Sequence, residues 1–142
     1  MSLNYVDTSV LVAALVRESH TPRAERWLTV GNRDELAISE WTIAEFSSAL
    51  SMKLRVGSID IEVRGAALEA LSVMTHESLV LFPVTGAHFR AAARYADQHA
   101  LGLRAPDALH LAIAAAQGAT LCTFDKRLAA AGRTLGLATR LI

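Results

Sequence analysis

Four carboxylate residues in separate parts of the chain have the clearest chemical potential: Asp7, Glu45, Asp107 and Asp125. Asp7 and Asp125 come at or just after the ends of short apolar runs, whereas Glu45 and Asp107 lie within helical patterns. Two carboxylates ~4 Å apart repel each other by about 4 kcal/mol at an effective dielectric of ~20. Such a cluster persists only with a cation or a proton between its members. If the four acids converge, a divalent-metal site is therefore the first hypothesis.

The acids can converge if the segments that carry them form a parallel sheet. Short apolar runs alternate with longer helical patterns, which predicts an α/β domain with a largely parallel sheet. Strands are expected at 3–6, 36–39, 79–82, 119–122 and 138–142, and helices at 10–15, 22–28, 41–54, 60–75, 87–100, 106–117 and 126–131. Parallel strands end at one edge of the sheet, and ligands bind there near the point where the strand order reverses. We expect the four acids at that edge.

Each acid also has a structural explanation. Asp7 and Asp125 are placed to cap the helices that follow them. Thr42 and Glu45 have the spacing of a capping box, which would give Glu45 a role at the start of its helix. Asp107 falls in a first helical turn, where a carboxylate complements the helix dipole. Any one of these acids alone is weak support for a metal site, so the hypothesis rests on their combination.

Two further observations favour a cluster. Glu45 has no Lys or Arg three or four residues away, so its charge needs a partner from another part of the fold. Asp107 opens a helix that is apolar almost all round and is therefore expected to be buried. Carboxylate ligands without an accompanying set of His and Cys favour Mg²⁺ or Mn²⁺ over zinc. We interpret His110, in the same helix, as a hydrogen-bonded packing residue and leave it out of the catalytic set.

Size and composition limit the possible classes of protein. The 142 residues are 52% apolar, which fits one domain with an ample core. No run approaches the roughly 18 apolar residues of a membrane span, and a signal peptide's basic start is missing, so we expect a cytoplasmic protein. The single Cys122 excludes an internal disulfide and is too little for a structural zinc site. Fourteen basic residues balance fourteen acidic ones, which neither supports nor excludes a nucleic-acid substrate.

Several segments together resemble the PIN-domain ribonucleases. These are Tyr5–Leu11, the helical Glu45, Pro106–Ala112 and Thr123–Leu128. The most specific stretch runs from residue 102 to residue 125, where an acid opens an apolar helix, a glycine ends it, and a strand leads into Thr-x-Asp. In length and order of its segments, the chain is similar to a single-domain VapC-type toxin of a toxin–antitoxin pair. The resemblance covers essentially the whole chain.

The resemblance implies a three-layer α/β/α domain, spanning residues 1–142, around a parallel sheet. It also implies an endoribonuclease that depends on Mg²⁺ or Mn²⁺ and is inhibited by a cognate VapB-type antitoxin. Asp7, Glu45 and Asp107 match the core acidic residues of the family, and Asp125 matches its more variable fourth acid. All four acids are intact in this chain. The resemblance therefore implies an active enzyme with an RNA substrate.

Other polar residues have assigned parts in this hypothesis. Thr8 or Ser9 and Thr123 match positions at which family members place a hydroxyl beside the site, where it supports a carboxylate or the phosphate. Three basic residues flank the acids and are candidate RNA contacts, although basic residues beside loops are commonly solvated surface: Arg104, Lys126 and Arg127. We expect the apolar helical surface of residues 41–75 to serve a homodimer or the antitoxin.

Other classes of protein compete with the nuclease. A phosphatase of the haloacid dehalogenase type needs a second Asp where this chain has Ser9, and a metal-adhesion motif needs a hydroxyl at Leu11. Both patterns fail. The alternative that stays open is a non-catalytic PIN-like module that binds protein or RNA, in which the acids only cap helices. Metal affinity distinguishes the two interpretations.

Overall fold

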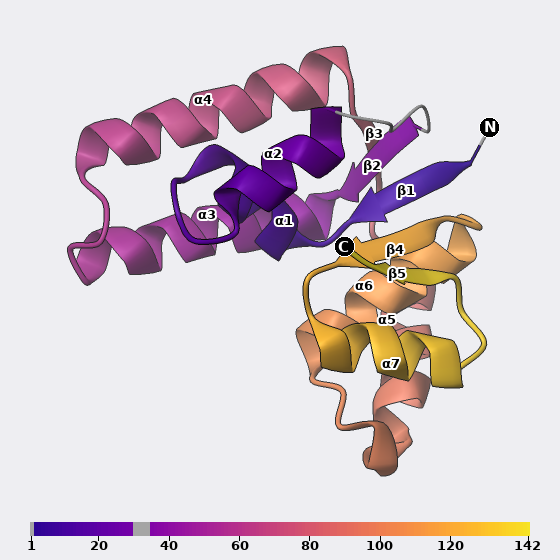
Figure 1. Cartoon of the computed structure of the whole chain (residues 1–142). Helices are drawn as coiled ribbons and strands as arrows, with labels where there is room; N and C mark the ends of the chain where they lie inside the picture. The colour runs from indigo at the N-terminus through magenta and orange to yellow at the C-terminus, as the bar shows by residue number, and fades with distance from the viewer. Residues whose placement is uncertain (1, 30–34) are drawn as a thin grey trace.

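Parallel strands form the centre of the protein (Figure 1). The computed structural model describes residues 2–29 and 35–142. Within these residues the sheet has the order β3-β2-β1-β4-β5, and every neighbouring pair is parallel. The strands are β1 (Leu3–Val6), β2 (Glu35–Ser39), β3 (Val80–Phe82), β4 (Thr120–Thr123) and β5 (Thr139–Leu141). The predicted α/β class with a largely parallel sheet is confirmed, and each expected strand is found within one residue of its predicted ends.

Helices cover both faces of the sheet, which confirms the three-layer arrangement (Figure 1). One layer consists of α1 (Thr8–Leu15), α2 (Thr21–Thr29), α3 (Glu40–Arg55) and α4 (Ile61–Glu77). The other consists of α5 (Gly86–Asp97), a 3₁₀ turn (His99–Leu101), α6 (Ala105–Ala116) and α7 (Lys126–Thr134). In Figure 1, α3 and α4 form a hairpin that extends beyond the sheet. No helix in the described ranges is long and apolar enough to cross a membrane.

The two cores follow from the alternation of side chains along the strands. Successive residues of a strand point to opposite faces. Tyr5 of β1 belongs to the core cluster with α6 and α7, whereas Val6 belongs to the cluster with α1 and α3. Residues 108–114 of α6 are all buried, as its apolar sequence predicted. The sheet and α6 therefore form a rigid support for the residues at the strand ends.

The start of α3 differs from the prediction. The helix begins at Glu40, and Ser39 is its N-cap, with the Ser39 Oγ accepting a hydrogen bond from the Thr42 backbone N–H at 3.3 Å. Thr42 Oγ1 in turn accepts from the Ser39 backbone N–H at 3.1 Å. The capping box thus joins Ser39 and Thr42, and the proposed box of Thr42 and Glu45 is wrong. Glu45 is left free for another role.

Helix α7 runs beyond the residue at which we expected it to end, because Gly132 does not terminate it. Gly132 is buried, and a Cβ at this position would collide with Cγ2 of Thr139 on β5. The glycine therefore allows β5 to pack closely against the helix. The left-handed glycine that follows the helix is Gly136, with φ 75°, and its N–H donates to the Arg133 carbonyl oxygen at 2.9 Å.

Candidate active site

The strand order reverses between β1 and β4. From β1 the chain adds β2 and β3 on one side of the sheet, and it then adds β4 and β5 on the other. Asp7 directly follows β1, and Asp125 lies two residues after the end of β4. The Asp7 backbone N–H donates to the Cys122 carbonyl oxygen at 3.0 Å, which ties the ends of these strands together. This is the edge at which the sequence predicted a ligand site.

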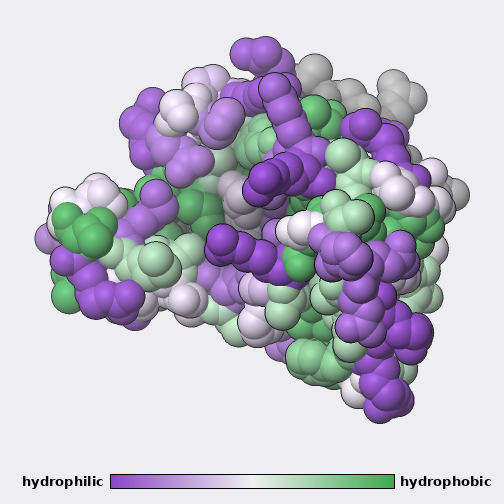
Figure 2. Space-filling model, turned by 90° about the horizontal axis from the view of Figure 1, so that it is seen from below, coloured by the Kyte–Doolittle hydropathy of each residue, from purple (hydrophilic) through white to green (hydrophobic). Residues whose placement is uncertain are grey.

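All four predicted acids line one cleft of about 420 Å³ at this edge. Asp7 comes from the β1–α1 junction, Glu45 from α3, Asp107 from the first turn of α6, and Asp125 from the β4–α7 junction. In Figure 2 the molecule is hollowed between the α3–α4 hairpin and the α5–α7 helices, and hydrophilic side chains gather around the hollow. The fold thus brings together residues that are up to 118 positions apart in sequence (125 − 7).

Asp7 is buried and is held by two hydroxyl groups. Its backbone occupies the N-cap position of α1, but its side chain caps no backbone N–H, so the capping explanation is wrong for Asp7. Its Oδ2 accepts hydrogen bonds from Ser9 Oγ at 2.9 Å and Thr123 Oγ1 at 2.8 Å. Its Oδ1 accepts none from the described residues. One oxygen of the carboxylate is therefore fixed by the fold, and the other is available to a ligand.

Glu45 reaches α1 and α6 from α3. Thr8 Oγ1 donates to Glu45 Oε1 at 2.7 Å, and His110 Nε2 makes a hydrogen bond to the same oxygen. Burial acts to raise the pKa of Glu45, but the hydrogen bonds from His110 and Thr8 outweigh it and leave the pKa below its usual value. Glu45 is therefore ionised at neutral pH, and its charge has partners from other elements, as its cation-poor helix predicted.

Asp107 is partly buried and makes no side-chain hydrogen bond with the described residues. Burial, followed by the negative charges of Asp7 and Asp125, raises the pKa of Asp107 to about 6. The nearby His110 acts in the opposite direction but does not cancel the effect. Asp107 therefore bears electrostatic strain from its burial and from the neighbouring carboxylates.

Asp125 is exposed and has a clear structural role. Its Oδ1 accepts hydrogen bonds from the backbone N–H groups of Arg127 at 2.9 Å and Leu128 at 3.3 Å, so it caps α7. The capping explanation is confirmed for this residue. Its own backbone N–H donates to Thr123 Oγ1 at 2.9 Å, the hydroxyl that also holds Asp7. Asp125 lines the cleft while it caps the helix, so the two roles are compatible.

The predicted basic residues lie beside the cleft but do not neutralise it. Arg104 and Arg127 line a second pocket of about 250 Å³, together with Asp107 and Asp125. Lys126 is exposed and is not one of the residues that line this pocket. None of the three makes an ion pair with a described acid. Their contact with RNA stays a prediction.

Two residues near the acids were not predicted to contribute to the site. His110 is fully buried, as expected of a packing residue, but it also contacts Glu45. Its signal in the sequence was a polar ring on an apolar helix, one turn after Asp107. Glu18 also lines the cleft, and its Oε2 lies 3.6 Å from Lys53 Nζ. No sequence feature distinguishes Glu18 from a surface acid.

Residues 5–133 match the family model of the PIN domain. The chain belongs to the PIN-domain family. The match covers most of the chain, so the resemblance recognised in the sequence is confirmed. No curated protein sequence matches the chain significantly.

Solved structures share the PIN fold at low sequence identity. The VapC20 toxin of Mycobacterium tuberculosis, described as cleaving the sarcin–ricin loop, is 20% identical over 91% of this chain and 95% of its own, with a TM-score of 0.72. VapBC2 of Rickettsia felis, bound to a promoter DNA fragment, is 19% identical over 98% of both chains, with a TM-score of 0.70. FitAcB of Neisseria gonorrhoeae is 20% identical over 96% and 95%, with a TM-score of 0.71. At these identities the likeness shows the fold.

The ligand atoms in the cleft of this PIN domain fit a hard divalent cation. They are mainly carboxylate oxygens, the ligand type that Mg²⁺ and Mn²⁺ prefer. Asp7 Oδ1 has no hydrogen-bond partner in the described chain, and Asp107 is repelled by its neighbours. No group of three or more His, Cys, Asp or Glu side chains among the described residues is already arranged to hold an ion. The acids thus border an open cleft.

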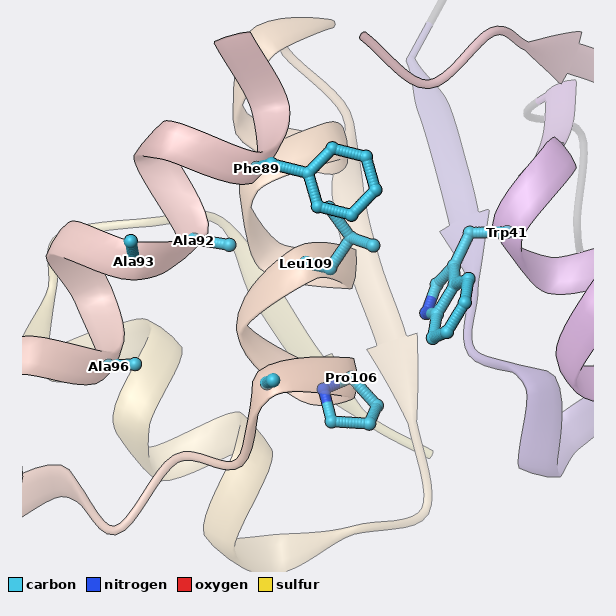
Figure 3. A pocket seen from close by; sticks show the side chains of 8 residues that line it. Trp41, Phe89, Ala92, Ala93, Ala96, Pro106 and Leu109 are labelled. Carbon is cyan, nitrogen blue, oxygen red and sulfur yellow. The ribbon is translucent and has the colours of Figure 1, made fainter. Parts of the chain in front are cut away.

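An apolar pocket of about 250 Å³ adjoins the acids of the PIN domain (Figure 3). Trp41 lies one helical turn before Glu45 on α3, and Pro106 immediately precedes Asp107 on α6. In Figure 3, Phe89 and Leu109 face the Trp41 indole across the pocket. The acid cleft is therefore flanked by this apolar surface as well as by the polar pocket that contains Arg104.

Proposed function

We propose that this PIN domain is an endoribonuclease that depends on Mg²⁺ or Mn²⁺ and serves as the toxin of a VapBC-type toxin–antitoxin pair. One observation carries the proposal: Asp7, Glu45, Asp107 and Asp125 come from four separate segments and line one cleft at the switch point of the sheet. The structural similarity to VapC toxins, one of them described as cleaving the sarcin–ricin loop, supports it. A caps-only module is disfavoured because Asp7 and Glu45 cap no helix.

In this proposal Asp7 and Asp107 hold the cation, and Asp125 adds a further carboxylate. Ser9 and Thr123 fix Asp7 Oδ2, so that Oδ1 is presented to the cleft. When bound, Mg²⁺ or Mn²⁺ would neutralise the phosphoryl oxygens and lower the pKa of the attacking water. The chain itself supplies the positions of these carboxylates around the open cleft.

Glu45 has two roles open to it, as a further ligand or as the group that orients the attacking water and accepts its proton. Its carboxylate is ionised at neutral pH because hydrogen bonds from His110 and Thr8 lower its pKa against the effect of burial. Both hydrogen bonds go to Oε1, so Oε2 is left for either role. In-line attack by water on the phosphodiester would leave a 5′-phosphate and a 3′-hydroxyl.

The proposed macromolecular partners are an RNA substrate, a cognate VapB-type antitoxin and a second copy of the chain. Arg104, Lys126 and Arg127 are exposed near the acids, where they can contact RNA phosphates. The α3–α4 hairpin exposes apolar side chains, among them Val56 at 80% and Ile61 at 69%, which supports a protein-binding role for this surface. We place the protein in the cytoplasm, where its RNA substrates are.

Incubation of the purified, antitoxin-free protein with total cellular RNA tests the function. We expect discrete cuts with Mg²⁺ or Mn²⁺, none after chelation by EDTA, and full recovery when excess Mn²⁺ is added back. Asp7→Asn protein, purified in the same way, controls for contaminating nuclease. Cuts that persist in EDTA would exclude metal dependence. A folded wild-type protein that cuts no RNA with either metal would make the non-catalytic binding module the better interpretation.

A further inference from the structure

Glu45 stands at the end of a buried chain of hydrogen bonds. The Tyr5 hydroxyl on β1 lies 2.7 Å from Ser39 Oγ, 3.2 Å from Thr42 Oγ1 and 2.7 Å from His110 Nδ1. The opposite ring nitrogen of His110, Nε2, makes the hydrogen bond to Glu45 Oε1. Tyr5, Ser39, Thr42 and His110 are all at most 1% exposed. These hydrogen bonds therefore link the sheet to the acid cleft through groups that water does not reach.

With a neutral His110 imidazole, the partners determine the direction of the hydrogen bonds that link Tyr5 to Glu45. An ionised Glu45 only accepts, so the proton of His110 lies on Nε2. In a neutral imidazole Nδ1 then accepts, and the Tyr5 hydroxyl donates to it. The Tyr5 oxygen in turn accepts from the hydroxyls of Ser39 and Thr42, whose oxygens are themselves acceptors from each other's backbone N–H groups. In this arrangement the Tyr5 hydroxyl uses its one hydrogen on His110.

The two carboxylate oxygens of Glu45 differ in their hydrogen bonds. Oε1 accepts from His110 and from Thr8, whereas Oε2 accepts no hydrogen bond from the described residues. Hydrogen bonds that donate in sequence polarise one another, which strengthens the last one. We propose that His110, whose ring is fixed by Tyr5, is a positioning residue that holds Glu45 Oε1 and thereby presents Oε2 to the cleft. The consequence for cleavage rests on the proposed function.

Packing alone does not account for these polar groups. The Tyr5 ring stacks on Phe82 with 6.3 Å between centroids and 6° between planes, a contact that a Phe at position 5 would keep. Two buried hydrogen-bonding partners can be replaced by apolar groups of the same shape at little cost in stability. His110 lies among apolar residues of α6, where an apolar side chain could fill the same space. Its contact with Glu45 is what an apolar residue cannot supply.

The Tyr5→Phe variant removes the hydroxyl and keeps the ring. We expect its single-turnover rate on saturating RNA to fall roughly tenfold, as is typical when a group that orients a site's ligands is lost. The KM for RNA should change little. Tyr95→Phe is the matched control, because the Tyr95 hydroxyl on α5 makes no hydrogen bond with the described residues, and this variant should cleave at the wild-type rate. A folded Tyr5→Phe protein with the wild-type rate would overturn the positioning role.

Replacement of His110 gives a rescue test. His110→Gln retains an N–H donor for Glu45, whereas His110→Leu retains only bulk, so the Gln variant should cleave faster than the Leu variant. Thermal unfolding of each protein checks that it is folded. Equal rates for two folded variants would contradict the donor role of His110. Should neither variant fold, the comparison of Tyr5→Phe with Tyr95→Phe still decides the question.

A second readout does not depend on activity. In ¹⁵N-labelled wild-type protein, NMR of the imidazole rings should show His110 protonated on Nε2 and not on Nδ1, with slow exchange of that proton with water. Tyr5→Phe should accelerate the exchange. A proton on Nδ1 in the wild type would overturn the inferred chain. Should the wild type cleave no RNA, the proposed function fails, and the NMR result alone then decides the arrangement around Glu45.

Discussion

Asp7→Asn and Asp107→Asn proteins should fold normally and lose RNA cleavage. In the first variant the amide oxygen of Asn can still accept from Ser9 and Thr123, so the local hydrogen bonds survive while the charge disappears. Asp107 makes no side-chain hydrogen bond to a described residue, so its replacement breaks none there. A loss of ~4 kcal/mol of charge stabilisation corresponds to a rate decrease of roughly 10³-fold.

The measurement is the cleavage rate on RNA at saturating Mg²⁺, with thermal unfolding as the test of folding. Asp97→Asn is the matched control, since Asp97 is the exposed last residue of α5 and does not line the cleft. This control should cleave like the wild type. Cleavage retained by both site variants would refute the assignment of these two acids as metal ligands.

Cleavage should also fall as the pH is lowered through about 6. Burial and the charges of Asp7 and Asp125 raise the pKa of Asp107 to about 6, so this carboxylate becomes protonated below that pH. A proton and a cation compete for the same oxygen, so at limiting Mg²⁺ the rate should drop about tenfold per pH unit below 6. Higher Mg²⁺ should move this limb to lower pH. A rate that is constant between pH 5 and 7 at limiting Mg²⁺ would contradict the role of Asp107.

The raised pKa of Asp107 should also affect the stability of the metal-free protein. Because the pKa of Asp107 is raised to about 6 in the folded state from its ordinary value of 3.8, the folded state binds more protons between these pH values. The contribution of Asp107 to stability is therefore lost as the pH rises through this window. Asp107→Asn should be more stable than the wild type at pH 7.5, by about 1 kcal/mol once partial exposure is allowed for.

Thermal unfolding in EDTA measures this difference. The gain should correspond to a rise of ~3–6 °C in the Tm at pH 7.5. At pH 4 the gain in Tm should shrink towards zero, because the Asp107 carboxyl of the folded wild type is then protonated and uncharged, like the Asn side chain. A substitution that removes catalysis while it stabilises the fold marks a residue kept for function. If Asp107→Asn destabilises the protein at pH 7.5, the electrostatic strain assigned to the acids is wrong.

The positions of the acids were predictable because they depend on local sequence. A strand followed by an acid and a helix, as at Asp7 and Asp125, fixes that acid at one edge of a parallel sheet. The helix that contains Glu45 was recognisable from its apolar periodicity. Glu45 has no Lys or Arg three or four residues away, which indicated a partner from another part of the fold. These signals require only the hydrophobic pattern of the chain and the geometry of parallel strands.

The contacts between elements were not predictable from that pattern. The bond between His110 and Glu45 depends on how closely α6 and α3 approach, which the spacing of residues within either helix does not determine. The helix was predicted to end at residue 131, whereas it continues through Gly132, which allows Thr139 of β5 to pack closely. Sequence alone also could not decide between capping and ligand roles: Asp125 caps its helix and Asp7 does not.

Titration of the purified, antitoxin-free protein with Mn²⁺ by calorimetry, at pH 7.5, shows whether the acid cleft binds a divalent cation. We predict saturable binding by the wild type that is weakened at least ~10-fold in both Asp7→Asn and Asp107→Asn. Asp97→Asn should bind like the wild type. Absence of Mn²⁺ binding by a folded wild-type protein would contradict the proposed metal site.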